Sequence, residues 1–546
     1  MKVRVVILAA LGVLGVAAVA VAGALGYQMF FGASTDEAVT LVPRDAVAYG
    51  NIFLDPSMDQ KRAIGDLLEK FPEAPNTDEA RNKLVDFLDE GLAEIDMNFE
   101  DDVDPWLGDQ VAGFALMPEN LAAMESAAPL AGGDAPAAAF LIASDDDAAA
   151  LDFVEEASAN SDDELIDKSY EGVDYVLNEA ENSAAGVVDG FLVIGTEIGL
   201  EAVVDVSSGE ANLSESGTFT ETTDELTEDR LATLYFDGRA FADALEESGG
   251  FPGAANFGVY SGFGGAGFNA FAPSAATLFV ESDKVVFEST TLAEDAGERQ
   301  LVENLSNGLL PDLPGESWGA FGIGDLGENL EELYDTMLEA LAEQGMGGSA
   351  DELDAQFEAQ TGLDLRADLL SWMGDAGLFV SGTDPNSVAG GLVVESTDPA
   401  TSSQTIARLE ALMQQQGAPT EPFSAGGAEG FKVAIPGAPQ SAVVLAGDRV
   451  VVAFGEQAAV RALESSDPLS ESEAFRSAGS GLGDGFVATG YFDVDAIQSL
   501  AEAAGAAQFP TYEQDVKPWL EPFSYVTFGS RADGDRLVQR LVVGID

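Results

Sequence analysis

The stretch LSESGTF at residues 213–219 returns almost unchanged as LSESEAF at residues 469–475. Sixteen residues after the closing Phe of each stretch, a second matching pair begins: YFDGRAFADAL at Tyr235 and YFDVDAIQSL at Tyr491. Both pairs are 256 residues apart, so the second match keeps the spacing of the first. This period is far too long for a solenoid or a propeller blade. It indicates two copies of a whole domain.

Two further matches precede these in the same order. Residues 188–203 resemble residues 446–463, and residues 105–116 resemble residues 371–382, the latter at an offset of about 266 residues. Each copy has roughly 250 residues, near the upper limit for one hydrophobic core. We therefore predict two tandem homologous domains, 34–308 and 309–546.

Hydrophobic patterning within the copies predicts strands that alternate with amphipathic helices. Residues 57–71 show helical spacing. Strands are expected over residues 45–54, 110–117, 137–143, 187–194 and 231–236. A hairpin over residues 275–292 closes the first copy, and a turn at Asp533-Gly534 forms a similar hairpin in the second. Hairpins pair neighbouring strands antiparallel. The expected fold class is therefore α+β, with a largely antiparallel sheet and packed helices in each domain.

The N-terminus has the pattern of a signal-anchor. Lys2 and Arg4 precede an uninterrupted apolar run over residues 5–25, which is long enough to cross a bilayer as a helix. Basic residues before the run and acidic residues after it indicate a cytoplasmic N-terminus and an extracytoplasmic body. Residues 1–33 are thus expected to be a cytoplasmic stub and a transmembrane helix, with the lipid bilayer as partner. The alternative is a signal peptide cleaved near AVAGA at residues 20–24.

The charge balance excludes several partners. The chain has 97 acidic and 23 basic residues and a formal net charge of −74. Nucleic-acid binding requires Lys and Arg that neutralise phosphate, so no nucleic-acid partner is expected. Docking on an anionic membrane surface is disfavoured for the same reason. A saline environment, in which dissolved cations screen the repulsion, and an acidic exported protein are both compatible with this charge.

The sequence has no cysteine and no histidine. Disulfides, thiolate metal sites and cysteine nucleophiles are therefore excluded. Serine–histidine–aspartate triads and histidine zinc ligands are excluded as well. We predict no catalytic residue, no cofactor and no metal site.

Three segments carry a resemblance to a known family. These are LVPRDAVAYGNIFLDPSMDQKRAIGDLLEKFP at residues 41–72, DVDPWLGDQVAGFAL at residues 102–116 and LYFDGRAFADAL at residues 234–245. In these segments the chain resembles a bacterial family of membrane-anchored proteins catalogued as a domain of unknown function, of the DUF 3352 type. The resemblance covers most of the chain and implies an exported, membrane-tethered protein. It implies no reaction, ligand or site residue.

Several motifs are weak candidates for chemistry. GFGGAG at residues 262–267 matches a dinucleotide-binding pattern, but no helix is expected after it. The acidic clusters at residues 100–104 and 144–147 lack EF-hand spacing, and the second is typical of a helix N-terminus. Trp106 and Trp372 recur at the repeat position, which favours a structural anchor over a ligand platform.

One segment without charged residues is the candidate contact site. Residues 249–275 combine many glycines with aromatic side chains in a chain that is otherwise densely charged. This segment is either an exposed contact loop or a loop buried against its own domain. The possible contact residues are Phe251, Phe257, Tyr260, Phe263, Phe268 and Phe271.

These observations favour a membrane-tethered extracytoplasmic protein with a non-enzymatic binding or scaffolding role. Its expected partner is an unknown envelope protein or an apolar ligand. One alternative is a carboxylate-dependent hydrolase of cell-envelope glycans, which would need two facing carboxylates in a cleft. Another alternative is a carrier of lipids or other apolar ligands.

Overall fold

The chain divides into two compact units in the computed structural model. The structure describes residues 35–71, 85, 88–89, 92–93, 97–117, 137–160, 165–179, 182–247, 272–293, 306–343, 350–435, 440–464, 466–509 and 511–546. The described part of the first unit lies between residues 35 and 293, and that of the second between residues 306 and 546. The limits 34–308 and 309–546 for the two domains stay a prediction.

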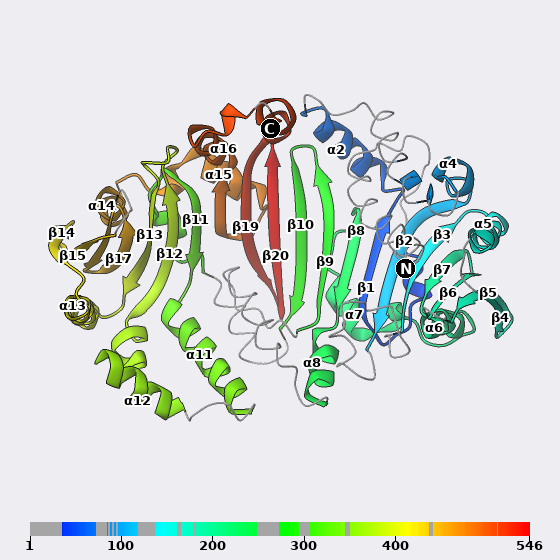
Figure 1. Ribbon diagram of the computed structural model, residues 1–546, viewed down its shortest axis with the longest axis horizontal. Coiled ribbons are helices and arrows are strands. Elements are labelled where there is room, and N and C mark those ends of the chain that lie inside the picture. The colour runs from blue at the N-terminus through cyan, green and yellow to red at the C-terminus, as the bar shows by residue number, and fades with distance from the viewer. Residues whose placement is uncertain are drawn as a thin grey trace. The chain divides into compact units, whose positions relative to one another are not determined.

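Described strands of the first unit form one antiparallel sheet (Figure 1). In pairing order they are β4 (Ile166–Tyr170), β5 (Val173–Asn178), β6 (Ser183–Val188), β7 (Phe191–Gly195), β3 (Ala138–Ser144), β2 (Leu107–Leu116), β1 (Ala46–Phe53), β8 (Ala232–Phe236), β9 (Ser274–Glu281) and β10 (Lys284–Leu292).

The second unit repeats this order strand for strand. Its strands are β14 (Thr420–Ala425), β15 (Ala428–Ala434), β16 (Ser441–Ala446), β17 (Arg449–Phe454), β13 (Ala389–Ser396), β12 (Met373–Ser381), β11 (Ser317–Ile323), β18 (Val487–Asp493), β19 (Phe523–Asp533) and β20 (Arg536–Ile545). Tyr235 of β8 pairs with Tyr49 of β1, and Tyr491 of β18 pairs with Ala320 of β11. The two tyrosines therefore occupy the same place in their sheets.

Helices cover both faces of the first sheet. They are η1 (Ala38–Thr40), α2 (Met58–Leu68), α4 (Phe99–Asp102), α5 (Asp147–Asn160), α6 (Glu197–Ser207), η4 (Leu213–Glu215), α7 (Gly217–Thr223) and α8 (Gly238–Glu247). Successive strand residues point to opposite faces, so Leu141 and Ile142 of β3 enter different cores. Leu141 shares its core with Leu200 of α6, and Ile142 shares the other core with Phe153 of α5.

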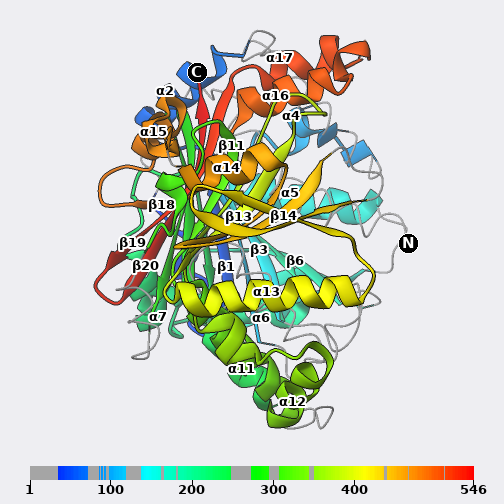
Figure 2. The same cartoon turned by 90° about the vertical axis from the view of Figure 1, so that its left-hand side faces the viewer.

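The second sheet is also covered on both faces. Its helices are η6 (Leu310–Asp312), α11 (Leu326–Glu343), α12 (Ala350–Thr361), η7 (Leu365–Leu370), α13 (Pro399–Gln415), α14 (Glu456–Glu464), η8 (Leu469–Glu471), α15 (Glu473–Gly481), α16 (Val494–Ala503), η9 (Ala506–Gln508), η10 (Tyr512–Val516) and α17 (Lys517–Leu520). Val393 of β13 packs in one core with Ala459 of α14, and Val394 packs in the other with Ile406 of α13. Figure 2 shows α13 and α14 on opposite sides of these strands.

The repeated LSES stretch forms the same local structure in both units. Leu213 and Leu469 each begin a short 3-10 helix and are completely buried. The Leu213 N–H donates to the carbonyl of Val42 at 2.8 Å, and the Leu469 N–H donates to that of Leu313 at 2.7 Å. The last Ser of the stretch, Ser216 or Ser472, caps the next helix through its hydroxyl. The stretch is thus hydrogen-bonded to the segment that precedes β1 or β11, and it leads directly into α7 or α15.

The expected strand over residues 187–194 is corrected to two strands. Asp189 and Gly190 both have positive φ, at 44° and 82°, which is the geometry of a tight hairpin turn. They separate β6 from β7, and the two strands pair with each other. The apolar residues on either side of the turn made the segment read as continuous.

The expected fold class and location are also corrected. The described residues form a mixed α/β fold built on large antiparallel sheets, and none of their helices is long and apolar enough to cross a membrane. The longest, α11, has 18 residues, but six of these are acidic. The transmembrane helix expected in residues 1–33 falls outside the described residues. The N-terminal transmembrane helix in the predicted fold is therefore not supported. The single-pass membrane location with an extracytoplasmic body relied on that helix and is withdrawn with it.

Candidate functional site

The predicted contact loop lies outside the described residues. All six of its aromatic residues, from Phe251 to Phe271, are in the undescribed part of residues 249–275. The second unit has a described segment at the matching place, between β18 and β19. This segment contains α16, η9, η10 and α17 and includes residues 503–522.

Four large apolar side chains are exposed in this segment of the second unit. Phe509 is 67% exposed, and this is the highest exposure among the large apolar side chains of the described residues. The other three are between 36% and 41% exposed. We call the four together the apolar patch: Ile497, Phe509, Val516 and Trp519. The matching places of both units thus carry aromatic side chains, and in the second unit these side chains reach solvent.

Side-chain contacts hold the elements of the apolar patch together. Asp493 caps α16 by accepting the N–H of Ala496 at 2.9 Å. The Gln498 side-chain amide donates to the carbonyl of Leu520 at 2.6 Å, which joins α16 to α17. No residue of α16 is fully buried. The patch is therefore built on short, mutually braced helices at the surface.

The segment that carries the apolar patch is acidic. From Asp493 to Glu521 the sequence has six acidic residues and one basic residue. That basic residue, Lys517, pairs with Glu502 at 2.9 Å, and this hydrogen bond raises the pKa of Lys517. Burial, with the charges of Asp493 and Asp546, raises the pKa of the Asp495 carboxyl. The field at the patch is therefore negative.

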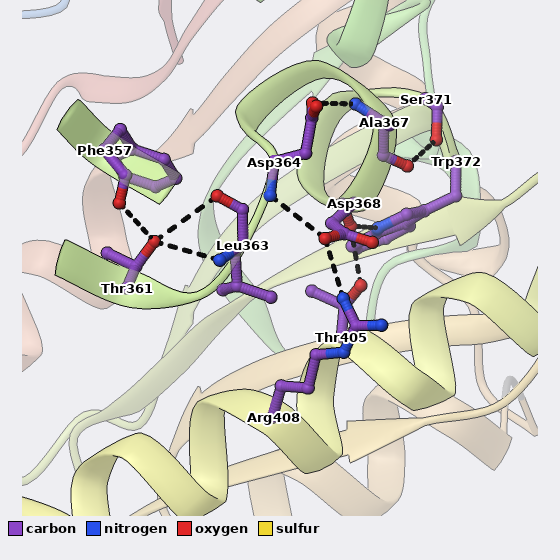
Figure 3. A network of polar contacts seen from close by, with 10 residues as sticks. All are labelled: Phe357, Thr361, Leu363, Asp364, Ala367, Asp368, Ser371, Trp372, Thr405 and Arg408. Atoms are coloured by element: carbon purple, nitrogen blue, oxygen red, sulfur yellow. Dashed lines mark hydrogen bonds and ion pairs between the residues drawn. The ribbon is translucent and has the colours of Figure 1, made fainter. Parts of the chain in front are cut away.

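The two repeated tryptophans are structural anchors, as the sequence indicated. The Trp372 indole N–H donates to the carbonyl of Asp368 at 2.9 Å, and the Thr405 hydroxyl donates to the same oxygen at 2.6 Å (Figure 3). Arg408 of α13 binds the Asp368 carboxylate at 2.7 Å. Trp372 is only 2% exposed. It locks η7 against α13 and presents no ring face to solvent.

Trp106 makes the same contact in the first unit. Its indole N–H donates to the carbonyl of Asp102 at 2.7 Å, and the ring packs on Phe153 with centroids 5.4 Å apart. Asn98 caps α4, and the Asp102 carboxylate accepts the Asn98 N–H at 2.7 Å. The acidic cluster at residues 100–104 is thus part of a helix cap.

The second acidic cluster is also part of a helix start. Asp146 accepts the N–H groups of Ala148 and Ala149 at 3.1 and 3.2 Å. Within the described ranges, no group of three or more acidic side chains is placed to hold a metal ion. The GFGGAG motif at residues 262–267 lies outside these ranges.

One pair of carboxyl groups has pKa values that are shifted apart, as an acid–base pair would require. Hydrogen bonds from Lys168 and Tyr175 lower the pKa of Glu197 against the effect of burial, whereas burial and the Glu197 charge raise that of Glu201. Tyr175 donates to Glu197 at 2.8 Å. In the second unit, Lys432 makes the equivalent contact with Glu456 at 2.8 Å.

The repetition of this contact favours a structural role. In each unit a side chain on the outer hairpin binds the Glu in the first turn of the next helix: Lys168 and Tyr175 bind Glu197, and Lys432 binds Glu456. The contact ties α6 and α14 to their hairpins. It gives no support to the hydrolase alternative.

Sequence reasoning missed a buried polar cluster in the first unit. The Tyr49 hydroxyl donates to the Asp36 carboxylate at 2.6 Å, and the Asn51 amide donates to the Gln110 side-chain oxygen at 3.2 Å. Burial raises the pKa of both Asp36 and Tyr49 and lowers that of Arg230. Polar residues at inward positions of the strand over residues 45–54 were the signal that could have revealed it.

Comparison with known proteins gives a family without a known function. The family model described as "Protein of unknown function (DUF3352)" matches residues 3–539. A search of curated proteins finds no match. Crystal forms III and IV of TP0453 are 12% and 14% identical to the chain, and both have a TM-score of 0.24. They cover 51% and 47% of this chain, and the match spans 89% and 80% of their own. Similarity at this level supports no inference about fold or function.

Proposed function

We propose that this chain, which belongs to the DUF3352 family of proteins of unknown function, is a non-enzymatic binding protein that docks a basic polypeptide segment on its apolar patch. The observation that carries the proposal is the 67% exposure of Phe509 within a group of exposed apolar residues. Several exposed apolar residues within one acidic segment of short helices are typical of an interaction site.

The position of the apolar patch supports a binding role. It lies in the connection where the two copies differ most in sequence, and loops between conserved elements are where binding residues collect. The scaffold around it is the same in both units. A tandem duplication of this kind leaves one connection free to change while the sheets keep the fold.

The negative charge supports a basic partner. The acidic rim and the net charge of −74 repel anionic partners and attract cationic ones. An apolar segment flanked by Lys or Arg would bury its apolar side chains on Phe509 and Val516 while its basic residues meet the rim. A second copy of this chain is disfavoured because it carries the same negative charge.

The test is a calorimetric titration of the full chain with a synthetic amphipathic peptide of Leu and Lys. We expect binding that weakens as salt rises, because the ionic part is screened. Changing Phe509→Ser should weaken it at least tenfold, since a buried aromatic anchor contributes about 1.5–3 kcal/mol. The matched control is Ile198→Ser on α6, where the side chain is 56% exposed but lies in the first unit.

The outcomes separate docking from charge attraction alone. Docking predicts that Ile198→Ser binds like the unchanged protein and that a peptide of Leu and Glu does not bind. If Phe509→Ser binds the basic peptide as well as the unchanged chain does, the acidic surface alone accounts for binding and the proposal is wrong. Equal loss in both variants would contradict it as well.

A further inference from the structure

The segment before the first strand of each sheet lies differently in the two units. We call these segments the straps: residues 36–42 in the first unit and residues 307–313 in the second. In the second unit the Leu309 N–H donates to the main-chain carbonyl of Ala376 at 3.0 Å. In the first unit the matching N–H, of Ala38, donates to the Gln110 side-chain oxygen at 3.2 Å. A side chain thus stands between the strap and the sheet only in the first unit.

A single position explains this difference. Gly322 of β11 lies two residues after Ala320, and a Cβ added there would collide with the carbonyl oxygen of Asn307 in the strap. The second strap therefore rests directly on the sheet. The matching residue of β1 is Asn51, which is completely buried. The first strap must stand above this side chain.

Beneath the first strap, three buried polar atoms lack a hydrogen-bond partner among the described residues. Asn51 Oδ1, Thr233 Oγ1 and Arg230 Nε are buried and make no hydrogen bond within the described structure. Asn51 and Thr233 are 0% and 1% exposed and lie directly opposite each other on β1 and β8. A buried polar atom without a partner costs about 1–3 kcal/mol. Three such atoms in one cluster point to something that binds them.

Arg230 is the second unusual feature of this cluster. Its Nη1 donates to the carbonyl of Thr227 at 2.9 Å, and its guanidinium lies 5.9 Å from the ring centre of Phe53. Within the described structure it has no ion-pair partner, although the chain has 97 acidic residues. The Asp36 carboxylate is close enough to affect its pKa but lies beyond ion-pair distance. A positive and a negative group thus lie near these unpartnered polar atoms without forming an ion pair with each other.

We infer that the polar groups between the first strap and the sheet form a binding site for a small zwitterion with a carboxylate and an ammonium group, of the amino-acid type. The guanidinium of Arg230 would bind the carboxylate. The ammonium group would donate to Asn51 Oδ1 and approach Asp36. The Thr233 hydroxyl supplies a further donor or acceptor. A net anion is opposed by Asp36, and a net cation by Arg230.

The second unit supports this assignment as an internal comparison. In the second unit, Gly322 takes the place of Asn51 and Ala320 takes the place of Tyr49. Phe486 takes the place of Arg230, because each lies five residues before the matching Tyr491 or Tyr235. The same sheet therefore folds without the polar cluster. The fold therefore does not require the polar cluster. The free energy lost by burying its unpartnered polar atoms in the first unit must have another explanation.

The test uses glycine, the smallest such zwitterion, titrated into the full chain by calorimetry. Acetate and methylammonium, which each carry half of the charge pattern, serve as comparison ligands. We expect saturable binding of glycine and weak or no binding of the other two. Thr233→Val should weaken glycine binding about tenfold, because it removes one hydrogen bond to a charged group. Its matched control is Thr489→Val in the second unit, which is also buried.

A second measurement keeps the inference testable if Thr233→Val folds poorly. Glycine labelled with ¹³C at the carboxylate should show a shifted carbon resonance when it binds beside the guanidinium, and Arg230→Gln should abolish the shift. If glycine does not bind the unchanged chain saturably, these polar atoms do not form a site for a zwitterion and the inference is wrong. Equal binding by Arg230→Gln would overturn it too. None of these outcomes depends on the apolar patch.

Discussion

The ring of Phe475 meets the ring of Tyr491 edge to face, with centroids 5.4 Å apart and planes at 89°. Phe219 and Tyr235 make the same contact in the first unit, with centroids 5.1 Å apart and planes at 75°. In each unit the Phe ends the LSES stretch and the Tyr begins the YFD stretch. The two repeated motifs therefore supply the two rings of one aromatic contact in each unit. Such a contact contributes about 0.5–1.5 kcal/mol to stability beyond the burial of its apolar area.

Truncation of this contact should cost the same in both units. Phe219 and Phe475 are 8% and 9% exposed, so either change to Ala should lower the free energy of unfolding by about 3–5 kcal/mol. Urea unfolding of the two variants would measure this. A large loss in one variant with little change in the other would show that the contact has different weight in the two units.

The tryptophan anchors should affect stability without affecting binding. Trp106→Phe and Trp372→Phe each remove an indole N–H that donates to a part-buried carbonyl, and we expect a loss of about 0.5–1.5 kcal/mol in the free energy of unfolding, the smaller loss for Trp372→Phe because Thr405 still donates to the same oxygen. Affinity for the basic peptide should stay unchanged, because neither ring belongs to the apolar patch. If a Trp372→Phe variant of unchanged stability bound the basic peptide more weakly, Trp372 would be a ligand contact.

The Asp36 carboxyl should make stability depend on pH. Burial raises its pKa in the folded state above the ordinary value of 3.8, so the folded chain binds this proton more tightly than the unfolded chain does. Stability from this group therefore rises as pH falls from neutral through the folded pKa and levels off below the unfolded pKa.

Asp36→Asn should remove this dependence and make the protein more stable at neutral pH. The amide can still accept from the Tyr49 hydroxyl, which donates to Asp36 at 2.6 Å, and it carries no charge to bury. Urea unfolding of both proteins at several pH values between 4 and 7 gives the difference in their free energies of unfolding, and this difference should change with pH. A constant difference across this range would show that Asp36 titrates normally.

The repeat and most of the strands could be predicted from the sequence because their signals are local. Hairpin turns, alternating apolar residues and two matching phrases lie within short windows. The polar cluster could not be predicted in this way, because its contacts are long-range: Gln110 accepts the N–H of Glu37, 73 positions earlier. The effect of Asn51 on the strap becomes clear only when the structure shows Gly322 at the matching place in the second unit. The exposure of Phe509 is likewise a property of the folded chain.

Salt should stabilise the protein. Repulsion among 97 acidic residues is only partly offset by 23 basic ones, and dissolved cations screen it. The melting temperature of the chain should therefore climb between low and molar salt. A flat or falling melting temperature would show that the charge is compensated locally.

The aromatic glycine-rich segment of the first copy stays a predicted contact site. Replacing Phe257, Phe263 and Phe268 together with Ser should weaken a partner contact and leave the melting temperature nearly unchanged. If the rings are core residues, the same change should destabilise by several kcal/mol, since each buried Phe contributes about 1.5–3 kcal/mol. Thermal unfolding of the triple variant distinguishes these outcomes.

Hydrogen–deuterium exchange of the full chain, with and without the Leu and Lys peptide, tests the proposed docking most directly. We expect the peptide to slow exchange in residues 494–520, around Phe509 and Trp519, and to leave exchange in α6 around Ile198 unchanged. Protection spread over the acidic surface of both units, or confined to other elements, would contradict it.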